Sequence, residues 1–283
     1  MYDGTLQSNL DAPPALQRAK GVIRLDAVTR AGKSRLGNLY QSGCGKVRFP
    51  RIYDHSMMEA VIINTAGGLT GGDRFDVTAG VGPDAALRLS GQACERLYRR
   101  RDGQACMETR LSAADNADLH WLPQETILFD GSALSRRLFV DLAVGARFIG
   151  LEATVFGRAA MGETSISARF RESWRLRIDG KLVYADEAGL DGDLTATLSR
   201  ATATLGATCT VGCAYVGPDP EAFRDLLRAE VPPQDGLDWG CSLRRGVLVC
   251  RAVAEASGPL RLWIADIYRI LSGGLSLPRP WYC

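Results

Sequence analysis

The stretch Ile166-Ser-Ala-Arg-Phe-Arg-Glu-Ser-Trp-Arg-Leu-Arg-Ile178 alternates apolar and polar side chains with a period of two. Its even positions are apolar except Glu172, and its odd positions are serine or arginine. Successive side chains of a strand point to opposite faces of a sheet, so this pattern predicts a half-buried antiparallel strand. The turn Asp179-Gly180 then leads into Lys181-Leu-Val-Tyr184, which predicts a hairpin.

Similar strand signals, separated by glycine and aspartate turns, extend from about residue 21 to residue 215. Helical periodicity comes late: Asp219-Pro220 predicts the start of a helix over 221–230, and an apolar stripe predicts another over 260–271. The tail from Leu277 to Cys283 is predicted to be extended. We therefore expect an all-β dominated protein with two α-helices in its C-terminal half. Residues 1–18 are predicted to be a flexible lead-in, and residues 19–283 a single β-rich domain.

Composition excludes several classes of protein. The 283 residues include 34 basic and 32 acidic side chains, so the net charge of +2 gives no reason to expect nucleic acid or an anionic membrane as a partner. No run of about 18 apolar residues is present, and the N-terminus has no export signal. We expect a soluble cytoplasmic protein.

The eight cysteines do not have the spacing of a metal site, because no C-x-x-C pair occurs. The two histidines, His55 and His120, do not lie at ligand spacing from a cysteine. Cys209 and Cys213 lie in an apolar strand-like stretch and are interpreted as small buried hydrophobic residues. No tightly bound cofactor is expected.

The segment Ile63-Asn-Thr-Ala-Gly-Gly-Leu-Thr-Gly-Gly-Asp73 places four glycines and an acid after a strand-like run. It is not a phosphate-binding loop, because no lysine follows Gly72 and the acid would repel a phosphate. We interpret it as a bend between stacked strands, with Asn64, Thr65 and Asp73 pointing into the interior.

Three glutamates fall on apolar faces of predicted strands: Glu125, Glu152 and Glu172. An ionised carboxylate is costly to bury unless it is paired or bound to a cation. These side chains therefore meet an arginine, with Arg158 as the candidate partner, or they line a wet passage.

These acids are consistent with three alternative functions. Paired carboxylates on a β-rich scaffold perform acid–base chemistry in enzymes that cleave polysaccharides, although aromatic residues are only 7% of this chain. Oxygen ligands without cysteine or histidine also suit a route for an exchangeable divalent cation. The third alternative is an interaction scaffold. The arginines on the polar face of the 166–178 strand are interpreted as a solvated surface, with docking of an acidic partner as the alternative.

Four ordered motifs resemble a known family: the loop 63–73, Gln92-Ala-Cys-Glu-Arg-Leu-Tyr-Arg99, Trp121-Leu-Pro-Gln-Glu-Thr-Ile-Leu-Phe-Asp-Gly131 and Gly157-Arg-Ala-Ala-Met-Gly-Glu163. They resemble the urease accessory proteins UreD, also called UreH, over about residues 20–283. Cys94-Glu95 departs from the more common Thr-Lys of that family.

The resemblance implies a β-helix-like stack of strands and a non-enzymatic scaffold. Its implied partners are UreF, the GTPase UreG through UreF, and the urease structural subunits, in a dimeric accessory complex without nucleic acid or membrane. Nickel in transit is implied to pass through an internal tunnel toward the urease active site. On this basis Glu125, Asp130, Glu152 and Glu163 are predicted to line the transient nickel path. Arg158, Asp73 and Asn64 are predicted to be structural partners of the path. The alternative is a β-helical enzyme that acts on acidic polysaccharide.

Overall fold

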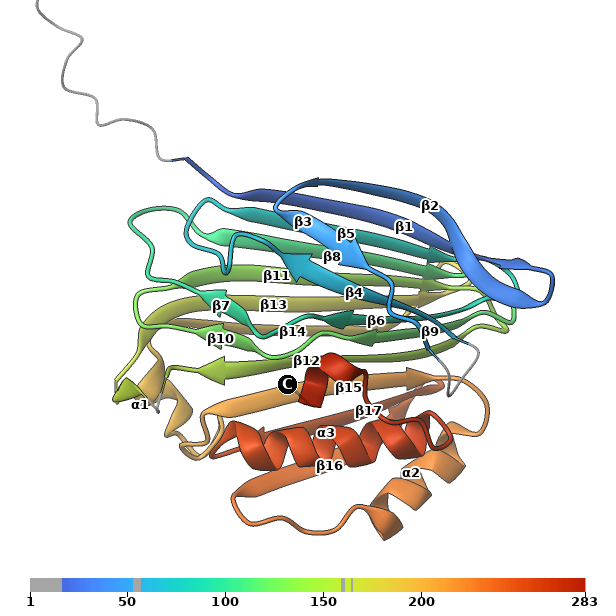
Figure 1. Ribbon diagram of the computed structural model, residues 1–283. Helices are drawn as coiled ribbons and strands as arrows, with labels where there is room; N and C mark the ends of the chain where they lie inside the picture. Colours follow the sequence, from blue (N-terminus) through green and yellow to red (C-terminus); the bar gives the residue numbers. More distant parts are fainter. Residues whose placement is uncertain (1–16, 53–56, 159–160, 164, 283) are drawn as a thin grey trace, which may run out of the picture.

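A computed structural model describes residues 17–52, 57–158, 161–163 and 165–282 of the chain. Most of these residues belong to two sheets that lie face to face (Figure 1). The seven-stranded sheet contains, in spatial order, β14 (Lys181–Asp193), β13 (Ser167–Ile178), β11 (Ala133–Leu142), β8 (Ala105–Ala113), β5 (Arg74–Val81), β1 (Lys20–Arg30) and β2 (Lys33–Gly43). We call it sheet A.

The second sheet, sheet B, has ten strands. Its main path runs through β16 (Leu237–Arg244), β17 (Val247–Ala254), β15 (Cys209–Val216), β12 (Arg147–Phe156), β9 (Asp118–Leu122), β6 (Ala86–Gly91), β4 (Met58–Asn64) and β3 (Gly45–Arg48). Two short strands complete it, because β10 (Thr126–Leu128) pairs with both β12 and β7 (Glu95–Leu97).

Between β4 and β13 the chain passes alternately through the two sheets, and each strand pairs in parallel with the strand one coil later. This arrangement confirms the β-helix-like stack. Antiparallel hairpins close the two edges of sheet A. The strand predicted from residues 166–178 is β13. It is antiparallel to β14, through the predicted turn at Asp179-Gly180, but parallel to β11, so the antiparallel prediction was right for one neighbour only.

The packing has three layers and two apolar cores. One core fills the space between the sheets, and the other lies between sheet B and the C-terminal helices. Strand β12 contributes to both, with Phe148 and Phe156 on one face and Ile149 and Leu151 on the other. Because β12 is buried on both faces, a charged side chain on it costs free energy unless it is paired, and Glu152 is such a side chain.

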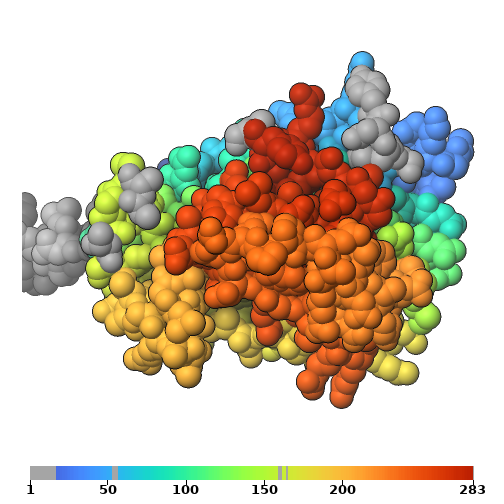
Figure 2. Space-filling view, turned by 90° about the horizontal axis from the view of Figure 1, so that it is seen from below, coloured from blue at the N-terminus to red at the C-terminus, as the bar shows by residue number. Residues whose placement is uncertain are grey.

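The helices are α1 (Leu194–Leu198), α2 (Pro220–Glu230) and α3 (Ser257–Leu271). The two longer ones confirm the predicted pair, and the five-residue α1 was not predicted. Both α2 and α3 lie over the antiparallel end of sheet B (Figure 1). Figure 2 views this side from below and shows it covered by the C-terminal part of the chain, coloured orange to red. Within the described part of the chain, no helix has the length and apolarity that a bilayer crossing requires.

The start of α2 was predicted correctly, because Asp219 is its N-cap residue and Pro220 its first residue. Asp219 adopts a left-handed conformation there, with φ of 51°, and its side chain makes no capping hydrogen bond. The prediction for the tail was wrong. The tail was expected to be extended, whereas Arg279–Tyr282 forms a 3-10 turn. The turn is fixed because the Trp281 indole is buried and its Nε1 donates to the Leu122 carbonyl oxygen at 3.1 Å. Of the predicted lead-in, residues 1–16 lie outside the described residues.

Candidate functional site

A cavity of about 240 Å³ lies between the two sheets. Its apolar wall includes Phe75 and Val77 of β5, Met107 of β8 and Trp121 of β9. Its polar lining consists of Asn64, Gln92, Cys94, Glu95, Arg96, Thr109, Gln124, Thr126, Arg136 and Glu152. The strands of both sheets therefore bring together polar groups that are far apart in the sequence.

Arg136 of β11 lines this cavity from sheet A and is almost fully buried. Its Nε lies 3.1 Å from Glu152 Oε2, and its Nη2 forms an ion pair with Glu172. The guanidinium also donates to the hydroxyls of Thr126 at 2.9 Å and Thr154 at 2.8 Å. The planar guanidinium holds two carboxylates and two hydroxyls at once, which an ammonium group cannot do with the same geometry.

Glu152 of β12 is a buried acid whose ionised form is disfavoured. Burial, together with the nearby charge of Glu172 and against the attraction of Arg136, raises the pKa of its carboxyl to about 7. Trp121 Nε1 donates to Glu152 Oε1 at 3.2 Å, which favours the ionised form. Since one guanidinium faces two carboxylates, this group of three either has one surplus negative charge or has a proton on Glu152 near neutral pH.

A second hollow of about 600 Å³ lies against sheet A, where strands β11, β13 and β14 meet. Arg136 lines both this hollow and the cavity, and Glu172 lines the hollow. The Arg136–Glu172 ion pair therefore stands between the interior cavity and the outer hollow.

Glu95 of β7 also lines the cavity, beside the glycine-rich loop. Asn64 Nδ2 donates to Glu95 Oε1 at 3.0 Å and also contacts the Gly68 carbonyl oxygen at 3.4 Å. Burial raises the pKa of the Glu95 carboxyl to about 7, although the Asn64 hydrogen bond opposes this shift. Among the described residues, no lysine or arginine forms an ion pair with Glu95, in contrast to Glu152. A cation in the cavity would meet an uncompensated carboxylate here.

The glycine-rich loop owes its composition to close packing. Gly68 has φ of 144°, and a Cβ atom there would lie 2.3 Å from the Tyr98 ring. Asp73 is buried and accepts backbone hydrogen bonds from Ala19 and Thr70, each at 2.8 Å. Asn64 lines the cavity, whereas Asp73 holds the loop together. Thr65, which was expected to point inward, is exposed, because its hydroxyl donates to the Cys44 carbonyl oxygen at the surface.

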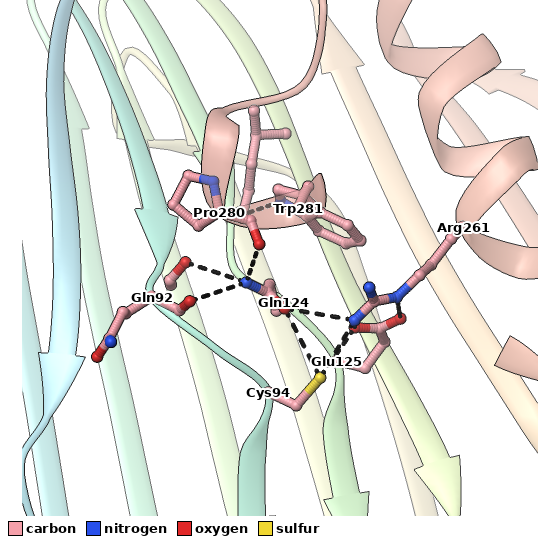
Figure 3. Close-up of polar contacts among 9 residues, drawn as sticks. Gln92, Cys94, Gln124, Glu125, Arg261, Pro280 and Trp281 are labelled. Atoms are coloured by element: carbon pink, nitrogen blue, oxygen red, sulfur yellow. Dashed lines mark hydrogen bonds and ion pairs between the residues drawn. The ribbon is translucent and has the colours of Figure 1, made fainter. Parts of the chain in front are cut away.

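Glu125 lies outside the cavity lining, under α3 (Figure 3). Arg261 of α3 binds it with two contacts, Nε to Oε1 at 2.6 Å and Nη2 to Oε2 at 2.9 Å. The Cys94 thiol lies 3.3 Å from Glu125 Oε2. Burial, and then the charge of Glu125, raise the pKa of Cys94 to about 11, so this thiol stays protonated. Gln124 completes the group by donating to the Pro280 carbonyl oxygen at 2.8 Å. The cluster fastens α3 and the C-terminal turn to sheet B.

Asp130 and Glu163 lie near each other at one edge of the stack, and each has its own arginine. Arg158 Nε lies 3.1 Å from Glu163 Oε1, and the Arg158 backbone N–H donates to Oε2 at 2.9 Å. The Arg158 guanidinium also lies over the Phe129 ring, 4.1 Å from its centroid. Asp130 forms an ion pair with Arg99 and accepts from the Ser167 backbone N–H at 2.9 Å. Arg158 is therefore the partner of Glu163, and the buried acids Glu125 and Glu152 have other arginines.

The sequence interpretation missed Glu95, Arg136 and Arg261. Arg136 had a detectable signal, because it occupies an apolar position in the alternation of β11 between Leu134 and Leu138. Glu95 and Arg261 had none, since β7 is three residues long and Arg261 lies on the edge of an apolar helix stripe. Within the described parts of the chain, no group of three or more His, Cys, Asp or Glu side chains is placed to hold a metal ion.

These features define a class of protein: a two-sheet β-helix with a polar interior cavity and helices fastened to one outer face. The model of the family described as UreD urease accessory protein matches residues 19–282. The chain therefore belongs to the UreD family of urease accessory proteins.

Individual relatives of the chain belong to the same family. The chain is 40% identical over 277 residues to the urease accessory protein UreD of Mesorhizobium japonicum, a match that covers 98% of this chain and 99% of that protein. It is 44% identical over 269 residues to the UreD protein of Sinorhizobium medicae, covering 94% of this chain and 97% of the relative. It is also similar to the protein called UreD 1 of Brucella melitensis, with 41% identity over 276 residues.

Proposed function

We propose that this chain is a scaffold for urease maturation that conducts nickel through its interior cavity. Membership of a urease accessory family implies the role in maturation. In the proposed assembly the chain binds UreF, receives nickel from the GTPase UreG through UreF, and docks on the urease structural subunits. If urease acquires its full nickel content in cells that lack this chain, the proposal is wrong.

The observation that supports a nickel path is the pair of carboxylates in the cavity, Glu95 and Glu152. Oxygen ligands bind divalent nickel less tightly than imidazole or thiolate, so they favour passage over retention. Both carboxyls have a pKa raised to about 7, so each exchanges a proton for a cation at little cost near neutral pH. Arg136 neutralises one of the two charges on Glu152 and Glu172, which limits how long a cation stays beside Glu152.

The other acids predicted for the path have different positions. Glu125 is held by Arg261, and Asp130 and Glu163 lie at the edge with their own arginines. Their place on a nickel route stays a prediction. The proposed path runs from Glu95 to Glu152 and continues past the Arg136–Glu172 ion pair to the outer hollow.

We expect the double variant Glu95→Gln with Glu152→Gln to lower the nickel content and activity of co-expressed urease several-fold. The amides keep the size of the side chains but remove the negative charge that attracts the cation. Nickel is measured by elemental analysis of purified urease, and co-purification with the accessory proteins checks assembly.

Glu108→Gln is the matched control, since Glu108 is also a strand glutamate, on β8 of sheet A, but pairs with Arg110 and Arg137 and does not line the cavity. Normal nickel loading by the double variant would refute the path. If only the Glu163→Gln variant fails to load urease with nickel, the path runs along the edge of the stack instead.

A further inference from the structure

Three cysteines form a row across neighbouring strands of sheet B. Cys213 of β15 pairs with Cys250 of β17, and Cys250 pairs with Cys241 of β16. Residues that are paired across antiparallel strands point to the same face. All three belong to the core between sheet B and the helices, and none lines the nickel cavity.

The β16–β17 hairpin determines which two cysteines are closest. Its turn has only two residues, Arg245 and Gly246, with φ of 49° and 77°, and the closing pair is Arg244 with Val247. In such a hairpin the closing pair is hydrogen-bonded, and hydrogen-bonded and non-hydrogen-bonded pairs alternate from there. Cys241 and Cys250 come three pairs after the closing pair, so they form a non-hydrogen-bonded pair.

Because the two kinds of pair alternate, Cys241 and Cys213 lie at different distances from Cys250. At a non-hydrogen-bonded pair the Cα atoms lie about 4.5 Å apart and the side chains are closer than at a hydrogen-bonded pair, where the Cα distance is about 5.5 Å. The backbone groups of Cys250 point toward β15, so its pair with Cys213 is the hydrogen-bonded one. Disulfides need Cβ atoms about 3.5–4.5 Å apart, which favours Cys241 as the partner.

The surroundings also distinguish Cys241 from the other two thiols. Cys241 is half-buried at the edge of α2, whereas Cys213 and Cys250 are buried. Arg228 Nη2 donates to the Cys241 carbonyl oxygen at 3.1 Å, and the Cys241 thiol lies 3.9 Å from the Arg224 carbonyl oxygen. The row therefore has one accessible thiol beside two arginines and one buried thiol next to it.

The thiol pKa values agree with this arrangement. A hydrogen bond from Cys250, and then the neighbouring Arg228, lower the pKa of Cys241 to about 6. The same interaction raises the pKa of Cys250, and burial raises that of Cys213 to about 12. The thiolate is the reactive form of cysteine, so Cys241 is the nucleophile of the row at neutral pH.

We propose that Cys241 and Cys250 are a peroxide-reactive pair that closes a cross-strand disulfide under α2. The Cys241 thiolate attacks one oxygen of hydrogen peroxide, the O–O bond breaks, and hydroxide leaves as Cys241 becomes a sulfenic acid. This hydroxide becomes water by taking from the solvent the proton that Cys241 released when it ionised. The Cys250 sulfur then attacks the Cys241 sulfur, an S–S bond forms and the S–O bond breaks. The departing hydroxide takes the Cys250 proton and leaves as water. In total, two thiols lose two electrons and one peroxide is reduced to two molecules of water.

The test treats the reduced full-length chain with hydrogen peroxide at pH 7, followed by alkylation, mass spectrometry of the intact chain and non-reducing peptide mapping. We expect the wild-type chain to lose two alkylatable thiols and to yield a Cys241–Cys250 linked peptide. Cys213→Ser is the matched control, because it removes the other neighbour of Cys250, and it should give the same product. Cys250→Ser should stop at the sulfenic acid on Cys241, which dimedone traps as one adduct.

Three results would overturn the proposal. The first is a disulfide that joins Cys213 to Cys250. The second is an equal loss of two thiols in Cys241→Ser. The third is a wild-type chain that retains all its thiols, or gains oxygen on Cys241 without a disulfide. Thermal midpoints of the reduced variants, measured beside the wild type, show that each has the native fold before peroxide is added.

Discussion

Replacing Arg136 with methionine is expected to destabilise the fold by about 3–5 kcal/mol, the cost of leaving a buried ion pair without one partner. Methionine fills much of the same volume but leaves Glu152 and Glu172 facing each other without a cation. Urea denaturation measures the change in the free energy of unfolding. Arg137→Met is the control on the same strand: Arg137 is 46% exposed and pairs with Glu108 at the surface, so we expect a loss of about 0–1 kcal/mol. Equal losses in the two variants would contradict the account of the inner cluster.

The same cluster makes the stability of the folded protein depend on pH. Burial raises the pKa of Glu152 from 4.5 to about 7 in the folded protein, so the folded state binds a proton that the unfolded chain releases. The stability that this proton contributes is complete below about pH 4.5 and is lost as the pH rises through about 7. Without Arg136 the pKa of Glu152 rises further. We therefore expect the Arg136→Met defect to be larger at pH 8 than at pH 5.5, and Glu152→Gln to remove most of this difference.

Filling the cavity is expected to have the largest effect on urease. Thr109 of β8 is buried, lines the cavity and is paired with Val77 on one side and Leu138 on the other. In Thr109→Phe the ring enters the cavity that Glu95 and Glu152 also line, so nickel loading of urease should fall to the level found without this chain. The cavity accepts part of the added volume, which keeps the destabilisation within the usual ~1–3 kcal/mol for overpacking.

Two controls separate a blocked path from a damaged fold. Thr109→Val keeps the cavity open and should load urease normally. Thr78→Phe places the same ring on the exposed face of β5, in the same sheet, and should also load normally. If Thr109→Phe co-purifies with its partners and still loads urease, nickel does not pass through this cavity.

The sequence was informative wherever a pattern is local. The alternation of residues 166–178 and the hairpin turn after it predicted β13 and β14, and the late helical periodicity predicted α2 and α3. A local pattern does not show which strands pair, so the parallel β11–β13 ladder was not foreseen. The 3-10 turn of the tail depends on a tertiary contact, the Trp281 hydrogen bond to Leu122, which no local propensity encodes.

The site was predicted in part for the same reason. Alternation placed Glu152 correctly on the face between the sheets, because strand geometry determines that face. The partner of Glu152 was not predicted, since Arg136 comes from the opposite sheet. Glu125 is also buried as predicted, but its partner Arg261 was not predicted, because sheet B is covered on both faces and alternation does not distinguish the cavity side from the helix side. The resemblance to UreD gave the family, which the matches confirmed, while the nickel path rests on the cavity and awaits measurement.

The most direct test of an enclosed path is nickel transfer in the presence of a chelator that cannot enter the cavity. The assembled complex of this chain with its accessory partners and nickel-free urease is supplied with nickel-loaded UreG, and EDTA is added to the solution before transfer begins. If nickel travels between Glu95 and Glu152, urease acquires nickel with the wild-type chain despite the chelator, and does not with Thr109→Phe. If the chelator stops transfer equally with both chains, nickel passes through the solvent and the central claim is wrong.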